Sequence, residues 1–247
     1  MMIFPSFRDL RNAEHFEEMK TWFICWVTLF ITLRFVIFRK RTADFSNRFV
    51  SIIHALIAIY LSLKSFKNGI NFKMFDNVGE RNTAEETYCM AFSLSYFVYD
   101  CLYCVCTVEL DAVAHHVFTI GGLMSGVVNK KSGCELVGCL FLMEVSNPSL
   151  HLRSLLRELK MKDSMFSTLN DLIFAGLFLV CRFVFGCPLV YKTLTCENSD
   201  LLVKIGAFGI LAVSVLWGWK IIKMFVSKAK QLFGFPHAKK KSKKKRS

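Results

Sequence analysis

Long apolar runs dominate this sequence and restrict the folds that the chain can adopt. A helix that crosses the hydrocarbon core of a bilayer needs about 20 consecutive, predominantly apolar residues. Seven runs approach this requirement, and the second and fourth are the weakest because one is short and the other is polar near its start. They cover residues 22–38, 49–63, 88–108, 112–128, 134–152, 169–191 and 201–222. The runs predict an all-α, polytopic transmembrane bundle of about seven helices.

Composition and charge distribution favour a membrane domain with a basic tail. Hydrophobic residues make up 53% of the chain and charged residues 21%, whereas soluble domains average about 45–50% and about 25%. Much of the net charge of +13 comes from residues 224–247, which hold nine Lys or Arg and no acidic residue. A nucleic-acid-binding fold would spread basic residues over a face between aromatic side chains, so we do not expect nucleic acid as a partner. A polybasic segment after the last apolar run is typical of a cytosolic tail that contacts anionic lipid headgroups.

The runs are not divided by linkers rich in Gly, Ser or Pro or by internal repeats, which predicts a single membrane domain. We expect an N-terminal segment with the first helix at 1–44, the main domain at 45–225 and a polybasic tail at 226–247. The first run lacks a small-residue cleavage site and contains Arg34, so we expect it to stay as a helix. With seven spans, the side that holds the tail carries 17 Lys or Arg and the other side carries 10. The positive-inside rule then places the C-terminus in the cytosol, an orientation that depends on the tail.

Ionisable side chains inside the apolar runs are the candidate functional residues, because a charge in hydrocarbon needs a partner or water. At 1.5 Å of rise per helical residue, five of them lie about 5–12 Å below the cytosolic face, and Arg182 lies about 20 Å below it. The five are His54, Asp100, His115, His116 and Glu144. Their common depth predicts a shared polar pocket in the cytosolic half of the bundle. His54 is also typical of a packing residue that hydrogen-bonds between helices.

Adjacent histidines point about 100° apart on a helix. We therefore expect one of His115 and His116 to enter the pocket and the other to bond a neighbouring residue. Cys101, Cys104 and Cys106 lie nearby in the sequence "CLYCVC". A structural zinc site would need a second cysteine pair, which is missing, and Cys104 and Cys106 diverge by about 200° of helical rotation. We predict small-residue packing there, with neither a bound metal nor a cofactor.

Two patterns concern helix packing. Gly122 and Gly126, in "GLMSG", have the GxxxG spacing that lets a neighbouring helix approach closely. Pro148 removes the donor for the carbonyl oxygen of Glu144 and predicts a kink in the fifth run, where irregular backbone often lines a cavity. The sequence "HLRSLLRELKMK" follows, with leucines along one stripe. It forms either an amphipathic helix in the membrane interface or the cytosolic end of the fifth span.

Five sequence elements together resemble a known family. In order, they are "NRFVSIIHALIAIYLSL", "YFVYD", "HHVFTIGG", "LFLMEVSNP" and "RFVFGCPLVY". Over roughly residues 45–225 they resemble the TLC domain shared by TRAM, ceramide-synthase (LAG) and CLN-type proteins. The resemblance implies a multi-pass protein of the endoplasmic reticulum, with six core helices around a lipid-accessible cavity and here one additional N-terminal helix. It also implies that His115 and His116 match the paired histidines that are essential in ceramide synthases.

The sequence departs from the ceramide-synthase branch in the next helix. That branch carries His-Asp and a further Asp where this chain has Met143, Glu144 and Asn147. The pattern is closer to the smaller TLC-domain proteins, which are linked to membrane lipid composition. We therefore expect a protein that binds a lipid or an acyl chain and acts in membrane lipid homeostasis. A ceramide-synthase-like N-acyltransferase is the alternative, and a transporter or cargo receptor is a remote one.

The N-acyltransferase alternative assigns roles to particular residues. Acyl transfer needs a base for the amine proton and a group that stabilises charge on the acyl carbonyl. The candidate catalytic residues are His115, His116, Glu144 and Asp100, and the candidate lipid- or substrate-binding residues are His54, Asn147 and Arg182. Acyl-CoA would then be a co-substrate, with a sphingoid base as the acceptor.

Two expectations concern partners and location. A second copy of the chain is a candidate partner. Lys244 and Lys245, fourth and third from the C-terminus, resemble a dilysine retrieval signal of the endoplasmic reticulum.

Overall fold

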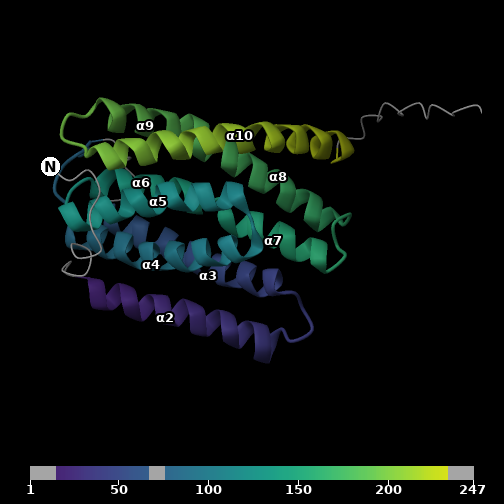
Figure 1. Ribbon diagram of the computed structural model, residues 1–247. Helices are drawn as coiled ribbons and strands as arrows, with labels where there is room; N and C mark the ends of the chain where they lie inside the picture. Colours follow the sequence, from purple (N-terminus) through teal and green to yellow (C-terminus); the bar gives the residue numbers. More distant parts are fainter. Residues whose placement is uncertain (1–14, 67–75, 233–247) are drawn as a thin grey trace, which may run out of the picture.

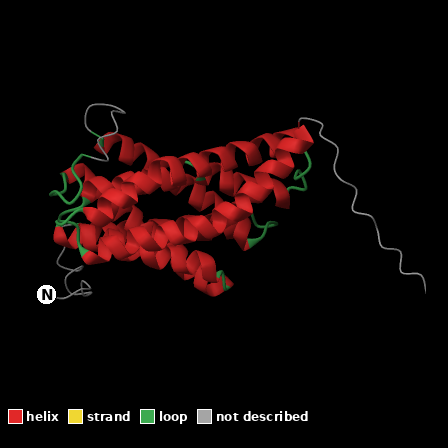
Figure 2. Ribbon diagram, turned by 90° about the horizontal axis from the view of Figure 1, so that it is seen from above, coloured by secondary structure: helices red, strands yellow, loops and turns green. Residues whose placement is uncertain are grey.

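The computed structural model describes residues 15–66 and 76–232, and within these ranges it is helical, with no named β-strand (Figures 1 and 2). The helices lie side by side with their long axes roughly parallel. In chain order they are α2 (Phe16–Thr32), η1 (Leu33–Ile37), α3 (Ala43–Ser65), α4 (Ala84–Thr107), α5 (Leu110–Asn129), α6 (Gly133–Glu144), α7 (Asn147–Glu158), α8 (Met165–Leu179), η3 (Val180–Phe185), α9 (Gly186–Thr195) and α10 (Leu201–Leu232), where η denotes a π-helix. The predicted all-α bundle is confirmed.

Within residues 15–66 and 76–232, five helical segments are long and apolar enough to cross a bilayer. They are Phe16–Ile37, Ala43–Ser65, Ala84–Thr107, Met165–Thr195 and Leu201–Lys228, and they correspond to the first, second, third, sixth and seventh predicted runs. The fourth run forms α5, whose 20 residues give a length of about 30 Å. Helix α10 continues to Leu232, past the end predicted at residue 222. The tail beyond it, with Lys244 and Lys245, lies outside the described residues.

The predicted fifth span is not one helix. Residues 134–152 are divided between α6 and α7, which have 12 residues each and are therefore about 18 Å long, short of a hydrocarbon core of about 30 Å. Pro148 lies in the first turn of α7, where a missing N–H leaves no helical hydrogen bond unmade. The predicted kink therefore takes the form of a two-residue turn, Val145 and Ser146, with the proline in the first turn of the helix that follows. Of the two alternatives for "HLRSLLRELKMK", a separate helix is observed, and α7 packs against α3 and α8.

Close helix packing around α5 confirms the prediction from the GxxxG spacing. A Cβ added at Gly126 would overlap the side chains of Leu136 and Met90. On the other side of α5, a Cβ at Gly209 of α10 would lie 2.6 Å from the ring of Phe118. Helix α5 is therefore held tightly between α4, α6 and α10, which fixes the positions of the two histidines at its beginning.

Candidate functional site

A polar cavity lies within the bundle, toward the end at which α7 is found (Figure 1). Side chains from α3, α4, α5, α6, α7, η3 and α10 line it. Six of the seven residues singled out from the sequence are among them: Asp100, His115, His116, Glu144, Asn147 and Arg182. The seventh, His54, is fully buried and stacks on Tyr96, another lining residue, with 3.7 Å between ring centroids. The residues predicted to share a pocket therefore lie around one cavity.

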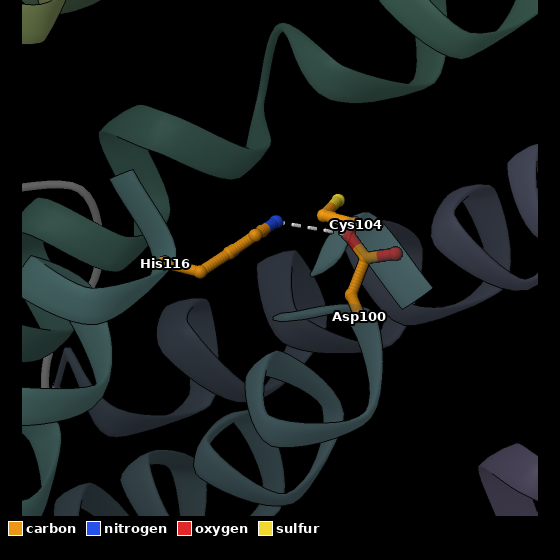
Figure 3. Close-up of side chains that lie close together, drawn as sticks. All are labelled: Asp100, Cys104 and His116. Atoms are coloured by element: carbon orange, nitrogen blue, oxygen red, sulfur yellow. Dashed lines mark ion pairs between the residues drawn. The ribbon is translucent and has the colours of Figure 1, made fainter. Parts of the chain in front are cut away.

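Asp100 is the centre of the strongest polar contacts in this cavity. Its Oδ2 lies 3.2 Å from Nε2 of His116, and its Oδ1 accepts a 2.9 Å hydrogen bond from the side-chain amide of Asn47 (Figure 3). The carbonyl oxygen of the same amide accepts a 2.6 Å hydrogen bond from the Tyr99 hydroxyl. Such a carboxylate–imidazole pair fixes the orientation of the imidazole ring, which leaves it ready to accept or donate a proton.

Glu144 forms the second polar cluster, at the end of α6. Its Oε2 accepts a 3.0 Å hydrogen bond from the Asn147 side chain and lies 3.8 Å from Nδ1 of His54, beyond hydrogen-bonding distance. Neither ring nitrogen of His54 has a hydrogen-bond partner. Asn147 lies three residues after Glu144, a spacing at which side chains meet on a helical backbone, and the contact is kept across the turn between α6 and α7.

The paired histidines have different neighbours. His116 contacts Asp100, whereas the ring of His115 lies 5.4 Å from that of Trp217 on α10. Both line the cavity, although only one was expected to enter it. The reason is that the cavity extends around α5, from α4 on one side to α10 on the other.

Sequence reasoning missed several residues of this site. Asn47, Ser51 and His54 recur at i, i+4 and i+7 and form a buried polar face of α3. This spacing is visible in the sequence and would have added Asn47 to the candidates. His151 was assigned to a helix without a functional role, yet it is 8% exposed and lines the cavity. The leucine stripe of its helix predicts which face is apolar and does not indicate that a histidine beside it is buried.

One group of side chains has the donor types of a metal site. Asp100, Cys104 and His116 each offer a ligand atom, and these atoms lie within 4.8 Å of one another (Figure 3). Cys104 comes from the "CLYCVC" segment and lies one turn after Asp100 on α4, but its partner in the Cys-x-x-Cys pair, Cys101, is not part of the group. Metal-bound histidines usually donate their second N–H to an acceptor, and Nδ1 of His116 has no such partner.

An apolar cavity lies between α5, α6, α9 and α10. Its lining is largely aliphatic, with side chains such as Leu123, Leu140, Leu189 and Leu211. Arg182 lines both this cavity and the polar one. The polar cavity and the apolar cavity therefore share one cationic side chain, that of Arg182.

Comparison with known proteins agrees with this architecture. The chain is similar to the zebrafish (Danio rerio) TLC domain-containing protein 2, with 26% identity over 151 residues, 58% of this chain. The aligned region spans 59% of the length of that relative. The TLC domain profile matches residues 44–223, from the beginning of α3 to the second half of α10. Since the matched region covers more than half of the sequence and contains several helices able to cross a bilayer, this multi-pass membrane protein belongs to the TLC-domain family.

Proposed function

We propose that the protein binds a single amphiphilic lipid or acyl chain within its bundle and thereby acts in membrane lipid homeostasis. The observation that carries the proposal is the pair of cavities with opposite character that share Arg182. Ligand pockets in proteins are mostly apolar with a few placed polar groups. The apolar cavity is lined largely by aliphatic side chains, which suit the chain of a lipid. The polar cavity supplies amide, imidazole, carboxylate and guanidinium groups for the head of the lipid.

The proposal is tested by identifying lipids that copurify with the full-length protein. Mass spectrometry of the purified protein should find a lipid in roughly stoichiometric amount. Leu211→Trp would fill the apolar cavity and should remove this lipid. Leu216→Trp, on the same helix at a side chain that is 68% exposed, should leave it bound. Equal lipid content in both variants would mean that the lipid is held at the outer surface and would contradict the proposal.

We further propose that the protein resides in the endoplasmic reticulum with its C-terminus in the cytosol. The polybasic end of the sequence and the dilysine-like Lys244 and Lys245 support this location. Replacing both lysines with serine should release the protein to later compartments, as followed by microscopy of the tagged chain in cells. If the double variant stayed in the endoplasmic reticulum, these lysines would not be needed for retention there.

The contact between His116 and Asp100 favours a second candidate function, an acyl-CoA-dependent lipid N-acyltransferase. A sphingoid amine would attack the thioester carbonyl, forming the amide C–N bond and breaking the C–S bond. His116, oriented by Asp100 at 3.2 Å, would take the amine proton and pass it to the departing CoA thiolate. Charge on the carbonyl oxygen would need a donor, for which the guanidinium of Arg182 is available on the same cavity.

Labelled acyl-CoA and sphingoid base, supplied to the purified protein, distinguish the two functions. Turnover that is abolished by His116→Ala and by His115→Ala would establish the transferase. Lipid binding without turnover would contradict the transferase and support the lipid-binding function in membrane homeostasis. Failure to bind any lipid and to turn over substrate would contradict both.

A further inference from the structure

Arg182 has a buried guanidinium without a carboxylate partner among the described residues. The side chain is 6% exposed and belongs to the π-helix η3. Its Nη1 donates one 3.2 Å hydrogen bond to the Ser214 hydroxyl, its Nε has no partner, and its Cζ lies 5.2 Å from the centre of the Phe178 ring. A guanidinium has five N–H donors, so most of its hydrogen-bonding capacity is unused. Burying a cation in this way is costly unless an anion compensates it.

The buried carboxylates nearest to the two cavities already have partners of their own. Glu135, which also lines the apolar cavity, accepts hydrogen bonds from the backbone N–H of Gly79 at 3.0 Å and from the Ser199 hydroxyl at 3.0 Å. Glu144 and Asp100, on the polar cavity, contact Asn147 and His116 respectively. In the part of the chain that the structure describes, none of these three carboxylates forms an ion pair with Arg182. Within the described residues, the junction of the cavities therefore holds a cation without an ion-paired carboxylate.

The backbone at this position is also unusual. π-helical turns are rare and are frequent at functional sites, and η3 interrupts an otherwise continuous helical segment, Met165–Thr195. The distortion lies where Arg182 lines both cavities. A planar guanidinium is suited to carboxylate and phosphate groups because it can form two parallel hydrogen bonds to them.

We propose that the lipid held by this protein is anionic, with its carboxylate or phosphate bound to Arg182 and its chain in the apolar cavity. This inference rests on the proposed lipid-binding function and narrows the ligand to one chemical class. The anion supplies the charge that the buried guanidinium lacks. Neutral lipids of the same chain length leave the guanidinium unpaired and therefore bind more weakly.

The test compares lipids that differ only in charge, using delipidated full-length protein in micelles of a neutral detergent. Palmitate is compared with hexadecanol, and lysophosphatidic acid with the corresponding monoacylglycerol, by tryptophan fluorescence and by the shift in unfolding temperature. A hydrogen-bonded charge pair corresponds to an affinity ratio of about 10 to 100. We expect this preference for the anionic member of at least one pair. The pair that shows the larger ratio identifies a carboxylate or a phosphate as the group recognised.

Substitutions at Arg182 and at a control lysine test whether Arg182 causes the preference for anionic lipids. Arg182→Met should abolish the preference, so that the charged and neutral members of each pair bind with equal affinity, and Arg182→Lys should retain part of it. Lys223→Met removes an exposed cation from α10 and should leave the preference intact, which excludes general attraction to a basic protein. The comparison on the wild-type chain needs no variant, so it decides the question even if Arg182→Met does not fold.

Two outcomes would overturn the inference. Equal affinity for the charged and neutral members of both pairs, with binding of all four lipids, would contradict the anionic ligand and leave the lipid-binding function standing. If Arg182→Met kept the full preference, the assignment of the anionic group to Arg182 would be contradicted. Absence of binding for all four lipids and of any copurifying lipid would instead contradict the proposed function itself.

Discussion

The contact between Asp100 and His116 should couple α4 to α5 energetically, and the structure allows its size to be worked out. Both residues are 7% exposed, and their side chains approach to 3.2 Å. Hydrogen bonds between membrane helices contribute about 0.6 kcal/mol on average and about 1.7 kcal/mol at most. Contacts with an ionised partner are roughly twice as strong as neutral ones. We therefore expect a coupling free energy of about 1–1.7 kcal/mol, near the upper end of the measured range.

A double-mutant cycle of Asp100→Asn, His116→Gln and the double variant measures this quantity. The free energy of unfolding is followed by tryptophan fluorescence in mixed micelles. The matched control is a cycle of Asp100→Asn with His115→Gln, since His115 is 8% exposed, lines the same cavity and forms no described hydrogen bond with Asp100. Its coupling should stay below about 0.5 kcal/mol, the range in which independent substitutions add. Equal coupling in the two cycles would refute the assignment of Asp100 to His116.

The remaining predictions concern stability and use the same unfolding assay. Glu135→Gln should cost about 1–3 kcal/mol, because this buried carboxylate accepts hydrogen bonds from a backbone N–H and a serine hydroxyl. The exposed Glu80→Gln should change stability by less than about 0.5 kcal/mol. Gly209→Ala should cost about 1–3 kcal/mol, since its Cβ would lie 2.6 Å from the Phe118 ring. Gly176→Ala, whose Cβ would meet no atom within 4 Å, should be neutral or stabilising; equal losses at both glycines would count against close packing of α5 with α10.

The sequence was sufficient to predict the bundle and the shared cavity because both follow from position along the chain. Apolar length determines which segments can span a bilayer, and the rise per residue determines depth within it. Asp100 and His116 were placed at compatible depths on consecutive runs, and in the structure they are in contact. Depth alone does not fix rotation about a helix axis. For this reason the sequence did not predict that His115 would face Trp217 or that Asn47 would join Asp100.

The break after α6 was beyond sequence reasoning for a different reason. An apolar run that contains a proline is compatible with a kinked span and with two short helices. The choice depends on tertiary contacts, such as the packing of α7 against α3 and α8. The apolar cavity was also unpredictable, because a pattern of apolar residues indicates which faces are buried and gives no measure of how completely they fill the space between helices.

Two departures from regular helix coincide with the two ionisable groups that most need explanation. A turn at Val145 and Ser146, both with right-handed helical dihedrals, interrupts the α-helix just after Glu144, and the chain adopts a π-helix at Arg182. Irregular backbone at membrane depth is tolerated where it is buried in protein or lines a cavity, since the backbone groups it frees must find other partners. Both residues line the polar cavity, and Arg182 lines the apolar one as well. A bundle that only had to be stable would gain by closing these irregularities with regular helix and apolar side chains. The π-helix at Arg182, where the two cavities meet, and the turn beside Glu144 on the polar cavity therefore support the lipid-binding function proposed above over packing alone.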